Sequence, residues 1–234
     1  MPNYLETIYS REEFSENDYP QLLCNQIFKK YYSIDGDAQG KKLLDIGSGK
    51  GNHLIGFARL GLEPSGIDKR DECLKILDEF TIRECDIENE KFPYDDNTFD
   101  FVFSKSVLEH VLNADNFISE TLRVLKPGGI VVFMVPDFAS NSYNYWTDYT
   151  HVKAWNRMGL QNAMILHGFQ DVKATLFTQL PMVWKFPWLK IVTKIIDIIS
   201  PHSFKWKDQE ETKMRPLIRF SKEKMVLGFG RKSK

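Results

Sequence analysis

The chain has 234 residues, of which 42% are hydrophobic and 13% aromatic, enough for one substantial core with insertions. Its 31 basic and 32 acidic residues leave a formal net charge of -1, so there is no cationic excess for a nucleic-acid backbone. Cys24, Cys73 and Cys85 form no C-x-x-C pair, which argues against a disulfide framework or a cysteine zinc site. The first residues lack the pattern of a secretory signal, and no apolar run is long enough to span a bilayer. A cytoplasmic location is therefore expected.

Residues 1–40 are typical of an N-terminal helical flap. Ser10 with Glu13 three positions later, and Ser15 before an acidic stretch, are helix-start signals. The apolar spacing that follows predicts a helix over 22–32.

Short apolar runs then alternate with amphipathic stretches. The apolar runs predict strands over 42–46, 64–68, 81–85, 99–104 and 130–136. The stretches between them predict helices over 53–61, 72–80 and 117–125. This alternation is typical of parallel strands joined by crossover helices, so we expect a doubly wound α/β core. Gly61 is expected to close the first helix, and Pro127–Gly129 to form a turn before the fifth strand.

The pattern changes after the fifth strand. A polar aromatic loop is followed by a predicted helix over 155–167 and by two strand-like runs, 171–177 and 225–230. A long segment separates these last two runs.

The strongest local signal is the stretch LLDIGSGKGNHL, in which a strand ends at Asp45 and a helix follows Gly51. Glycines in such a turn can take positive φ angles, and the N–H groups of the helix start favour an electron-rich ligand. The turn therefore predicts a nucleotide-like cofactor. The dinucleotide fingerprint G-x-G-x-x-G competes, with a nicotinamide dehydrogenase as its functional alternative, but Asn52 occupies the position of its third glycine.

Acidic residues stand at the ends of three successive predicted strands. They are Asp45, Asp68 and Asp86. Because the carboxyl ends of parallel strands meet in one crevice, we expect all three to face one ligand. Asp68 occupies the position where a carboxylate can accept hydrogen bonds from both ribose hydroxyls. For any one acid, a helix N-cap or a solvated loop position is the alternative.

Taken in order, these motifs resemble the class I S-adenosylmethionine-dependent methyltransferases, especially the ubiquinone-biosynthesis-like (type eleven) group. The resemblance covers roughly residues 40–170 and rests on DIGSGKG, GID, CDIENEKFPYDDNTFDFVFSKSVLEHV and LRVLKPGGIVVFMVP. It implies an α/β, Rossmann-like methyltransferase fold with a doubly wound, mostly parallel seven-stranded sheet. The runs 171–177 and 225–230 would form its antiparallel pair. It also implies S-adenosylmethionine as the cofactor.

The resemblance further assigns roles within the cofactor site. The glycine turn and the end of the fourth strand would lie beside the methionine portion, Asp68 would hold the ribose, and Asp86 with Ile87 would meet the adenine edge. The complete predicted cofactor set is Asp45, Gly47, Ser48, Gly49, Asp68, Lys69, Asp86, Ile87, Ser104 and Lys105.

These expectations divide a single methyltransferase domain into four parts. They are the N-terminal helical flap 1–40, the cofactor-binding core 41–177, an insertion or cap 178–221, and the last strand and tail 222–234. The resemblance does not explain the insertion.

Methyl transfer from a sulfonium requires an aligned acceptor, exclusion of water and, for a hydroxyl acceptor, removal of a proton. His110, Asp148 and His151 are the predicted catalytic residues, with His151 receiving the proton and Asp148 as its partner. Packing at a helix start is the alternative for His110, and capping or packing for His151. No metal is expected, because Asp148 and His151 alone do not define a site, although Glu109 with His110 could complete one.

Aromatic residues in the polar loop could cover the substrate and exclude water. They are Tyr143, Tyr145, Trp146 and Tyr149. Ordinary packing of the loop is the equal alternative.

The segment 180–200 carries apolar residues on one helical face and flanking lysines. We favour packing of this face on the sheet. The alternatives are an interfacial helix on anionic lipid, which would make the protein membrane-peripheral, and a homodimer contact.

The function expected from the sequence is S-adenosylmethionine-dependent methyl transfer, most simply O-methylation, to a small-molecule acceptor such as a hydroxyl of a sugar, glycan or lipid-linked intermediate. The alternatives are a quinone-type C- or O-methyltransferase and a non-catalytic cofactor-binding module. Nothing in the motifs separates these acceptors, because acceptor residues come from variable loops.

Overall fold

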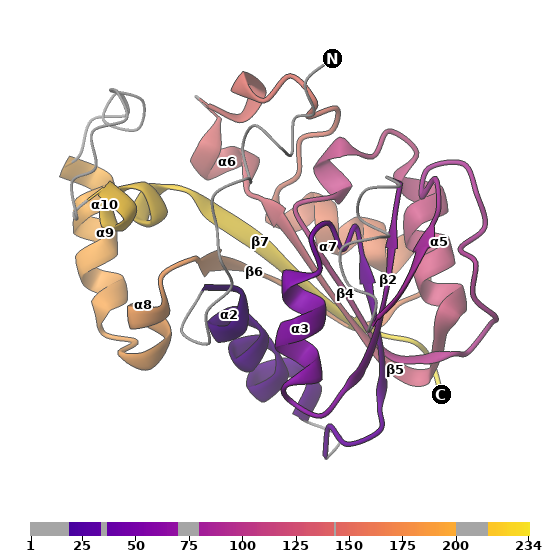
Figure 1. Cartoon of the computed structure of the whole chain (residues 1–234). Coiled ribbons are helices and arrows are strands. Elements are labelled where there is room, and N and C mark those ends of the chain that lie inside the picture. The colour runs from indigo at the N-terminus through magenta and orange to yellow at the C-terminus, as the bar shows by residue number, and fades with distance from the viewer. Residues whose placement is uncertain (1–18, 34–36, 70–79, 143, 200–214) are drawn as a thin grey trace.

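The computed structural model describes residues 19–33, 37–69, 80–142, 144–199 and 215–234, and every structural statement below concerns these residues. They build a seven-stranded sheet of order β3-β2-β1-β4-β5-β7-β6 (Figure 1). The strands are β1 Lys42–Ile46, β2 Glu63–Asp68, β3 Thr81–Glu84, β4 Phe99–Lys105, β5 Leu125–Pro136, β6 Gln170–Thr178 and β7 Lys224–Arg231. The first five pair in parallel, and β7 pairs antiparallel with β5 and β6. The expected doubly wound, mostly parallel sheet is confirmed.

Helices cover both faces of this sheet (Figure 1). They are α2 Tyr19–Ile27, η1 Phe28–Tyr32, α3 Asn52–Ala58, η3 Leu108–His110, α5 Ala114–Val124, α6 Phe138–Asn141, η4 Tyr145–Thr147, α7 Arg157–Leu166, α8 Pro181–Lys185, α9 Leu189–Ile199 and α10 Arg215–Lys222. Successive strand residues point to opposite faces, so Leu43 belongs to the apolar cluster that includes residues of α2 and α3, while Leu44 belongs to the cluster that includes residues of α5 and α7. The continuous apolar strands therefore supply two cores, one on each face.

The glycines of β7 allow α7 to approach the sheet closely. A Cβ on Gly228 would lie 2.8 Å from Leu160 Cδ2, and one on Gly230 would lie 3.0 Å from Met164 Cε. Both distances are too short for an ordinary contact, so larger residues here would push the helix away.

The expected turn at Pro127–Gly129 lies inside β5 and is a bulge. Strand β5 already pairs at Leu125 with Phe99, and the register then shifts so that Ile130 pairs with Phe101. Gly128 takes φ +78° and its N–H donates to the carbonyl of Lys232 at 3.0 Å. The C-terminal tail thus pairs with the bulge, which keeps these residues in the strand.

Several helix boundaries differ from the expected ones. The first predicted helix begins earlier, at Tyr19, and its end is the π-helical η1. Helix α3 ends at Ala58, while Gly61 takes the expected positive φ of 91° and donates to the Ala58 carbonyl at 2.9 Å. The capping signals before residue 19 and nearly all of the helix predicted over 72–80 lie outside the described residues.

The segment between β6 and β7 contains α8, α9 and α10, which gather at one side of the molecule (Figure 1). Helix α9 buries Thr193 and leaves Ile191, Ile195 and Ile198 exposed by 67%, 51% and 75%. We expected this apolar face to pack on the sheet, but in the described part of the chain these isoleucines are exposed and the expected packing is absent. None of the helices in the described ranges has the length and apolar character needed to cross a bilayer.

Candidate functional site

The glycine turn between β1 and α3 has the backbone conformation that its sequence predicts. Gly47, Gly49 and Gly51 take φ angles of 74°, 53° and 74°, in the left-handed region that favours glycine. The N–H groups of Gly47 and Ser48 both donate to the carbonyl of Ile67, at 2.8 and 3.2 Å. The turn is thereby fixed to the end of β2.

Two glycines of this turn differ in their surroundings. A Cβ on Gly47 would lie 2.3 Å from Val107 Cγ2, so the turn packs directly on the segment after β4. A Cβ on Gly49 would meet no heavy atom of the described residues within 4 Å. The turn is thus closely packed at Gly47 and open at Gly49, where a ligand can approach the backbone.

The acids at the ends of β1 and β2 lie together beside the turn, as predicted. The buried Asp68 accepts a hydrogen bond from the Gly49 N–H through Oδ2 at 2.9 Å. Asp45 is also buried, and its Oδ2 has no hydrogen-bond partner among the described residues. Burial raises the pKa of Asp45, the charge of Asp68 raises it further, and Lys105 opposes the shift. A buried, unsatisfied carboxylate beside an open turn suits a cationic ligand.

His53 is a neighbour of Asp45 that the predicted site did not include. Its Nδ1 lies 3.9 Å from Asp45 Oδ2. Burial, followed by the positive charge of Lys105, lowers the pKa of His53 to about 3, so the imidazole is neutral at physiological pH. In the sequence, His53 could have been identified from its position directly after the glycine turn, where it is the second residue of α3.

The predicted pair at the end of β4 lies in the same region, with different surroundings for each side chain. The buried Ser104 hydroxyl donates to the Ile46 carbonyl at 2.9 Å, which ties β4 to the end of β1. Lys105 Nζ lies 6.0 Å from the centre of the Tyr19 ring. Burial lowers the pKa of Lys105, and the negative charges of Glu109 and Asp45 oppose that shift.

The loop after β3 brings Asp86 to Lys69, which follows β2. Lys69 Nζ and Asp86 Oδ2 lie 3.3 Å apart, and Asp86 also accepts from the backbone of Glu88 and the side chain of Asn89. Through these contacts Asp86 stabilises the turn that follows β3, a role that was not among the alternatives considered from its sequence position. They hold the Asp86–Ile87 backbone at the edge expected for the adenine.

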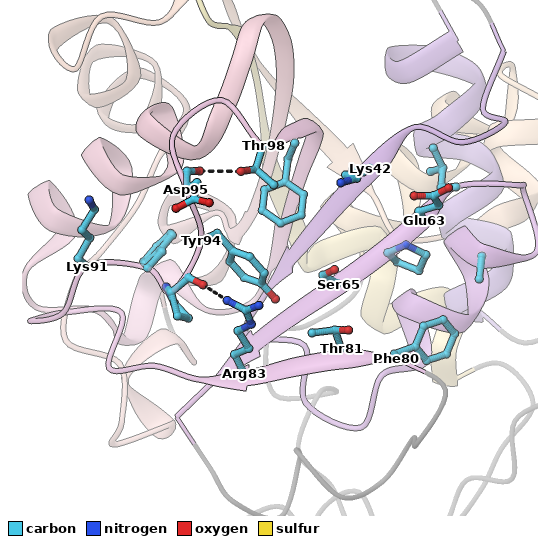
Figure 2. Close-up of a pocket in the computed structure, with 16 residues that line it drawn as sticks. Lys42, Glu63, Ser65, Phe80, Thr81, Arg83, Lys91, Tyr94, Asp95 and Thr98 are labelled. Atoms are coloured by element: carbon cyan, nitrogen blue, oxygen red, sulfur yellow. Dashed lines mark hydrogen bonds between the residues drawn. The ribbon is translucent and has the colours of Figure 1, made fainter.

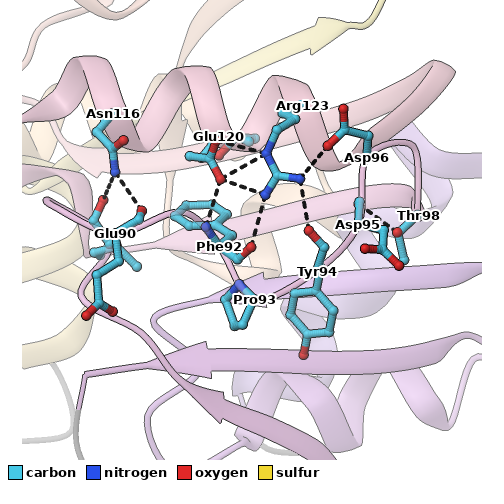
Figure 3. Close-up of polar contacts among 12 residues, drawn as sticks. Glu90, Phe92, Pro93, Tyr94, Asp95, Asp96, Thr98, Asn116, Glu120 and Arg123 are labelled. Atoms are coloured by element: carbon cyan, nitrogen blue, oxygen red, sulfur yellow. Dashed lines mark hydrogen bonds and ion pairs between the residues drawn. The ribbon is translucent and has the colours of Figure 1, made fainter.

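A network centred on Arg123 of α5 holds this loop in place (Figure 3). The guanidinium donates to Glu120, to Asp96 Oδ1 at 2.7 Å, and to the backbone carbonyls of Phe92 and Tyr94. A second donor on α5 adds to the network, because Asn116 Nδ2 donates to the carbonyl of Ile87 at 3.1 Å. The predicted adenine edge is therefore positioned by α5.

On the other side of the glycine turn, η3 is joined to the polar aromatic loop. The amides of Val152 and Lys153 donate to the Glu109 carbonyl at 2.9 and 3.2 Å, and Trp155 Nε1 donates to the Leu108 carbonyl at 3.1 Å. These bonds bring two segments that are distant in sequence into one site.

The predicted catalytic residues His110, Asp148 and His151 are brought together by this arrangement. The two imidazole rings have centroids 4.8 Å apart, and His151 Nε2 lies 3.8 Å from Asp148 Oδ2. Thr150 connects Asp148 to His110, because its hydroxyl lies 2.6 Å from Asp148 Oδ1 and 2.9 Å from His110 Nδ1. Sequence reasoning did not single out Thr150, whose role depends on this contact.

Glu109 belongs to the same cluster but was not in the predicted catalytic set. Its side chain is 1% exposed, Oε1 lies 3.9 Å from His110 Nε2, and Oε2 has no hydrogen-bond partner among the described residues. Burial raises the pKa of Glu109 to about 8. In the sequence, Glu109 stands out as a charged residue next to His110 in an otherwise apolar stretch, and this position indicates a possible role in the site.

The aromatic loop residues divide between packing and exposure. Tyr145 is buried, its hydroxyl donates to the Lys153 carbonyl at 2.7 Å, and its ring contacts His151. Trp146 and Tyr149 are exposed. Tyr143 lies outside the described residues. Tyr145 thus has the packing role. Of the three described aromatic residues, only the exposed Trp146 and Tyr149 could cover a substrate.

A hollow of about 850 Å³ lies at the opposite ends of the strands, and Figure 2 shows the residues that line it. It is lined by the amino ends of the parallel strands, including Lys42, Glu63 and Thr81, and by Arg83, whose guanidinium lies 4.6 Å from the centre of the Tyr94 ring. None of the predicted cofactor residues lines it. The hollow is therefore separate from the crevice at the carboxyl ends of the strands, where ligands of this sheet topology bind.

The residues of this crevice lie in a part of the chain that is similar to a known protein family. A family model described as a methyltransferase domain matches residues 44–133, which include the glycine turn, all three acids and η3. Over this range the chain is similar to class I S-adenosylmethionine-dependent methyltransferases of the ubiquinone-biosynthesis-like type.

Curated relatives show a similarity over a comparable share of the chain. The chain is 34% identical over 131 residues to a ubiquinone/menaquinone biosynthesis C-methyltransferase of Idiomarina loihiensis, an alignment that covers 50% of this chain and 52% of the relative. It is 32% identical over 116 residues to a ubiquinone biosynthesis O-methyltransferase of Alkalilimnicola ehrlichii, covering 46% and 47%. The chain thus spans about half the length of these relatives.

Solved structures share the fold of the methyltransferase domain. A SAM-dependent methyltransferase from Archaeoglobus fulgidus superposes with a TM-score of 0.64 at 18% identity, covering 98% of this chain and 100% of the other. Phosphoethanolamine N-methyltransferase 2 of Haemonchus contortus, in complex with S-adenosyl-L-methionine, gives 0.65 at 19% identity, covering 98% and 56%. At these identities the likeness establishes the fold alone.

Proposed function

We propose that this protein transfers a methyl group from S-adenosylmethionine to carbon or oxygen of a small quinone-type acceptor. The observation that carries the proposal is that the glycine turn, with Asp45 and Asp68, lies against the segment that bears Glu109 and His110. A cofactor crevice and a cluster of acid–base residues thus adjoin. The names of the relatives favour a quinone-type acceptor over the sugar or lipid-linked hydroxyl expected from the sequence.

The cofactor supplies an activated methyl group bound to a positively charged sulfur. In the proposed complex Asp68 accepts hydrogen bonds from the ribose, while Asp45 offers its buried carboxylate to the cationic methionine end. The N–H of Gly49 is already held by Asp68, so binding needs little rearrangement of the turn. Asp86 and Ile87 meet the adenine, and Ser48, Lys69, Ser104 and Lys105 complete the surroundings.

On the acceptor side, His110, Asp148 and His151 orient the substrate and take its proton. His151 Nδ1 lies 2.7 Å from the Tyr145 carbonyl, so Nδ1 carries the ring proton and Nε2 offers its lone pair. As the new bond to the methyl carbon forms and the carbon–sulfur bond breaks, the acceptor proton passes to Nε2. Asp148, 3.8 Å from Nε2, stabilises the charge that develops on the ring.

The direct test is methyl transfer from labelled S-adenosylmethionine to catechol and naphthoquinol acceptors. We expect a labelled product with the wild type and a loss of turnover, at unchanged cofactor affinity, when Asp148→Asn and His151→Ala are combined. Cofactor binding without product from any acceptor would instead support the non-catalytic module. Transfer to sugar hydroxyls but not to quinols would contradict the proposed acceptor class.

We also propose that the exposed face of α9 rests on an anionic lipid surface, where an apolar quinone precursor would be found. Lys185, Lys190 and Lys194 flank the face and carry the charge that such a surface attracts. The nearby Asp197 pairs with Lys224 at 2.9 Å, which reduces its repulsion of anionic lipid.

Co-sedimentation with vesicles tests this contact. The wild type should pellet with phosphatidylglycerol vesicles and be released by salt, whereas Ile195→Asn should stay in solution. Ile165→Asn on α7 is the matched control, because Ile165 and Ile195 are both 51% exposed. A homodimer that is lost in Ile195→Asn, with no vesicle binding by the wild type, would contradict the lipid surface.

A further inference from the structure

The acid–base cluster has the composition of a cation site. One ligand atom from each of Glu109, His110 and His151 lies within 4.8 Å of the other two. Two imidazoles and one carboxylate are a known catalytic ligand set for Zn²⁺, which keeps a fourth position open. In a tetrahedral site with bonds of about 2.0–2.2 Å the ligand atoms stand about 3.3 Å apart, so small side-chain rotations would close this cluster around an ion.

Backbone contacts already orient both imidazoles for this role. His151 Nδ1 lies 2.7 Å from the Tyr145 carbonyl, and His110 Nδ1 lies 3.2 Å from the Thr150 carbonyl. Carbonyl oxygens can only accept, so each Nδ1 is protonated and each Nε2 presents a lone pair. A hydrogen bond from the other ring nitrogen to a carbonyl is the usual outer-sphere partner of a metal-bound histidine.

Glu109 supplies the independent indication of a ligand. The side chain is 1% exposed, and Oε2 has no hydrogen-bond partner among the described residues. A buried carboxylate oxygen without a partner is costly unless a cation or a donor meets it. The backbone of Glu109 is fixed by the amides of Val152 and Lys153, so the carboxylate is held where it is by the same bonds that position His151.

We propose that Glu109, His110 and His151 bind a divalent transition-metal cation, with Zn²⁺ as the best match to the ligand set. The open position would take an oxygen of the methyl acceptor and lower its pKa. With the cation bound, Nε2 of His151 is a ligand and is no longer the base of the metal-free scheme above, and Asp148 would accept the acceptor proton in its place. This catalytic role rests on the proposed methyl transfer, whereas binding of the cation does not.

Calorimetric titration of the chelator-treated protein with Zn²⁺, Mn²⁺ and Mg²⁺ tests the site without any acceptor. We expect one Zn²⁺ per chain, bound more tightly than Mg²⁺. Glu109→Gln and His151→Ala should each weaken Zn²⁺ binding by more than roughly 100-fold, beyond the loss caused by removing an outer-sphere partner. His167→Ala is the matched control, since it removes a histidine with similar side-chain exposure, 16% against 12%, from a different place.

Binding of S-adenosylmethionine by each variant shows that it is folded. If Glu109→Gln is not folded, His151→Asn gives the same test with a smaller change of shape. Absence of Zn²⁺ binding by the wild type, or Zn²⁺ binding that Glu109→Gln and His151→Ala leave unchanged, would overturn the proposal.

Discussion

The backbone amide of Val152 donates to the carbonyl of Glu109 at 2.9 Å, and this bond joins the two halves of the acceptor side of the site. Glu109 lies in η3, shortly after the end of β4, whereas Val152 belongs to the chain segment between β5 and α7. Because Glu109 lies next to His110 and Val152 next to His151, the bond sets the separation of the two imidazoles. The chemistry of the site therefore depends on backbone pairing between loops.

Asp68 should contribute strongly to cofactor binding. Asp68→Ala removes the acceptor of the Gly49 N–H and the expected ribose contact, so affinity for S-adenosylmethionine should fall roughly 10- to 100-fold. Calorimetry measures this change. Asp115→Ala, which replaces an aspartate whose side chain is 87% exposed, should bind as the wild type does. Equal affinity of wild type and Asp68→Ala would rule out the ribose role.

The glycine turn allows steric and backbone effects to be separated. Gly49→Ala meets only the cost of the left-handed region, about 1–2 kcal/mol of unfolding free energy, because open space surrounds it. Gly47→Ala adds the clash with Val107 and should cost about 2–4 kcal/mol. Urea denaturation measures both values. A Gly47→Ala variant as stable as Gly49→Ala would mean that Val107 does not pack on the turn.

Asp45 should lower the stability of the ligand-free protein while it contributes to cofactor binding. Burial raises its pKa above that of the unfolded chain, so the stability that Asp45 costs the ligand-free fold begins as the pH rises through the unfolded-chain pKa and grows until the folded pKa is passed. Asp45→Asn removes the titrating group and should be more stable than the wild type at pH 8, with a smaller difference at pH 5, because pH 5 is closer to the unfolded-chain pKa of an aspartate. Urea denaturation at the two pH values measures the effect, and S-adenosylmethionine binding should weaken in the same variant. A variant that is less stable at pH 8 would contradict this reading of Asp45.

Arg123 should hold the loop that carries Asp86 and Ile87. A lysine cannot reproduce the fork of bonds to Glu120, Asp96 and two carbonyls, so Arg123→Lys should lower the free energy of unfolding by about 2 kcal/mol. Arg157→Lys, at an exposed position at the start of α7, is the control. An unchanged urea midpoint for Arg123→Lys would show that the loop is held by other contacts.

Much of the fold was predictable because each strand and helix has its own local signal. Apolar runs alternating with amphipathic stretches located all seven strands to within a few residues, except for the start of β5. That start was missed because Pro127–Gly129 has the composition of a turn, and its pairing with the C-terminal tail at Lys232 is not visible in the sequence. For α9, periodicity identified the apolar face but could not show which face meets α10.

The candidate site was predictable where topology alone brings residues together. Asp45 and Asp68 end neighbouring parallel strands, so their proximity follows from the sheet order. Glu109 was considered beside His110 as a possible metal ligand, but its contact with the loop around His151, like the role of Thr150, was not predictable, because both depend on how that loop folds back onto η3. The residues assigned to cofactor and acceptor remain predictions until variants are measured.

Calorimetric titration of the wild-type protein with S-adenosylmethionine, S-adenosylhomocysteine and NADH tests the central claim most directly. Stoichiometric binding of the first two ligands, without binding of NADH, is the predicted result, because the turn has Asn52 where a dinucleotide site has its third glycine. Binding of NADH in place of both sulfur-containing ligands would contradict the account.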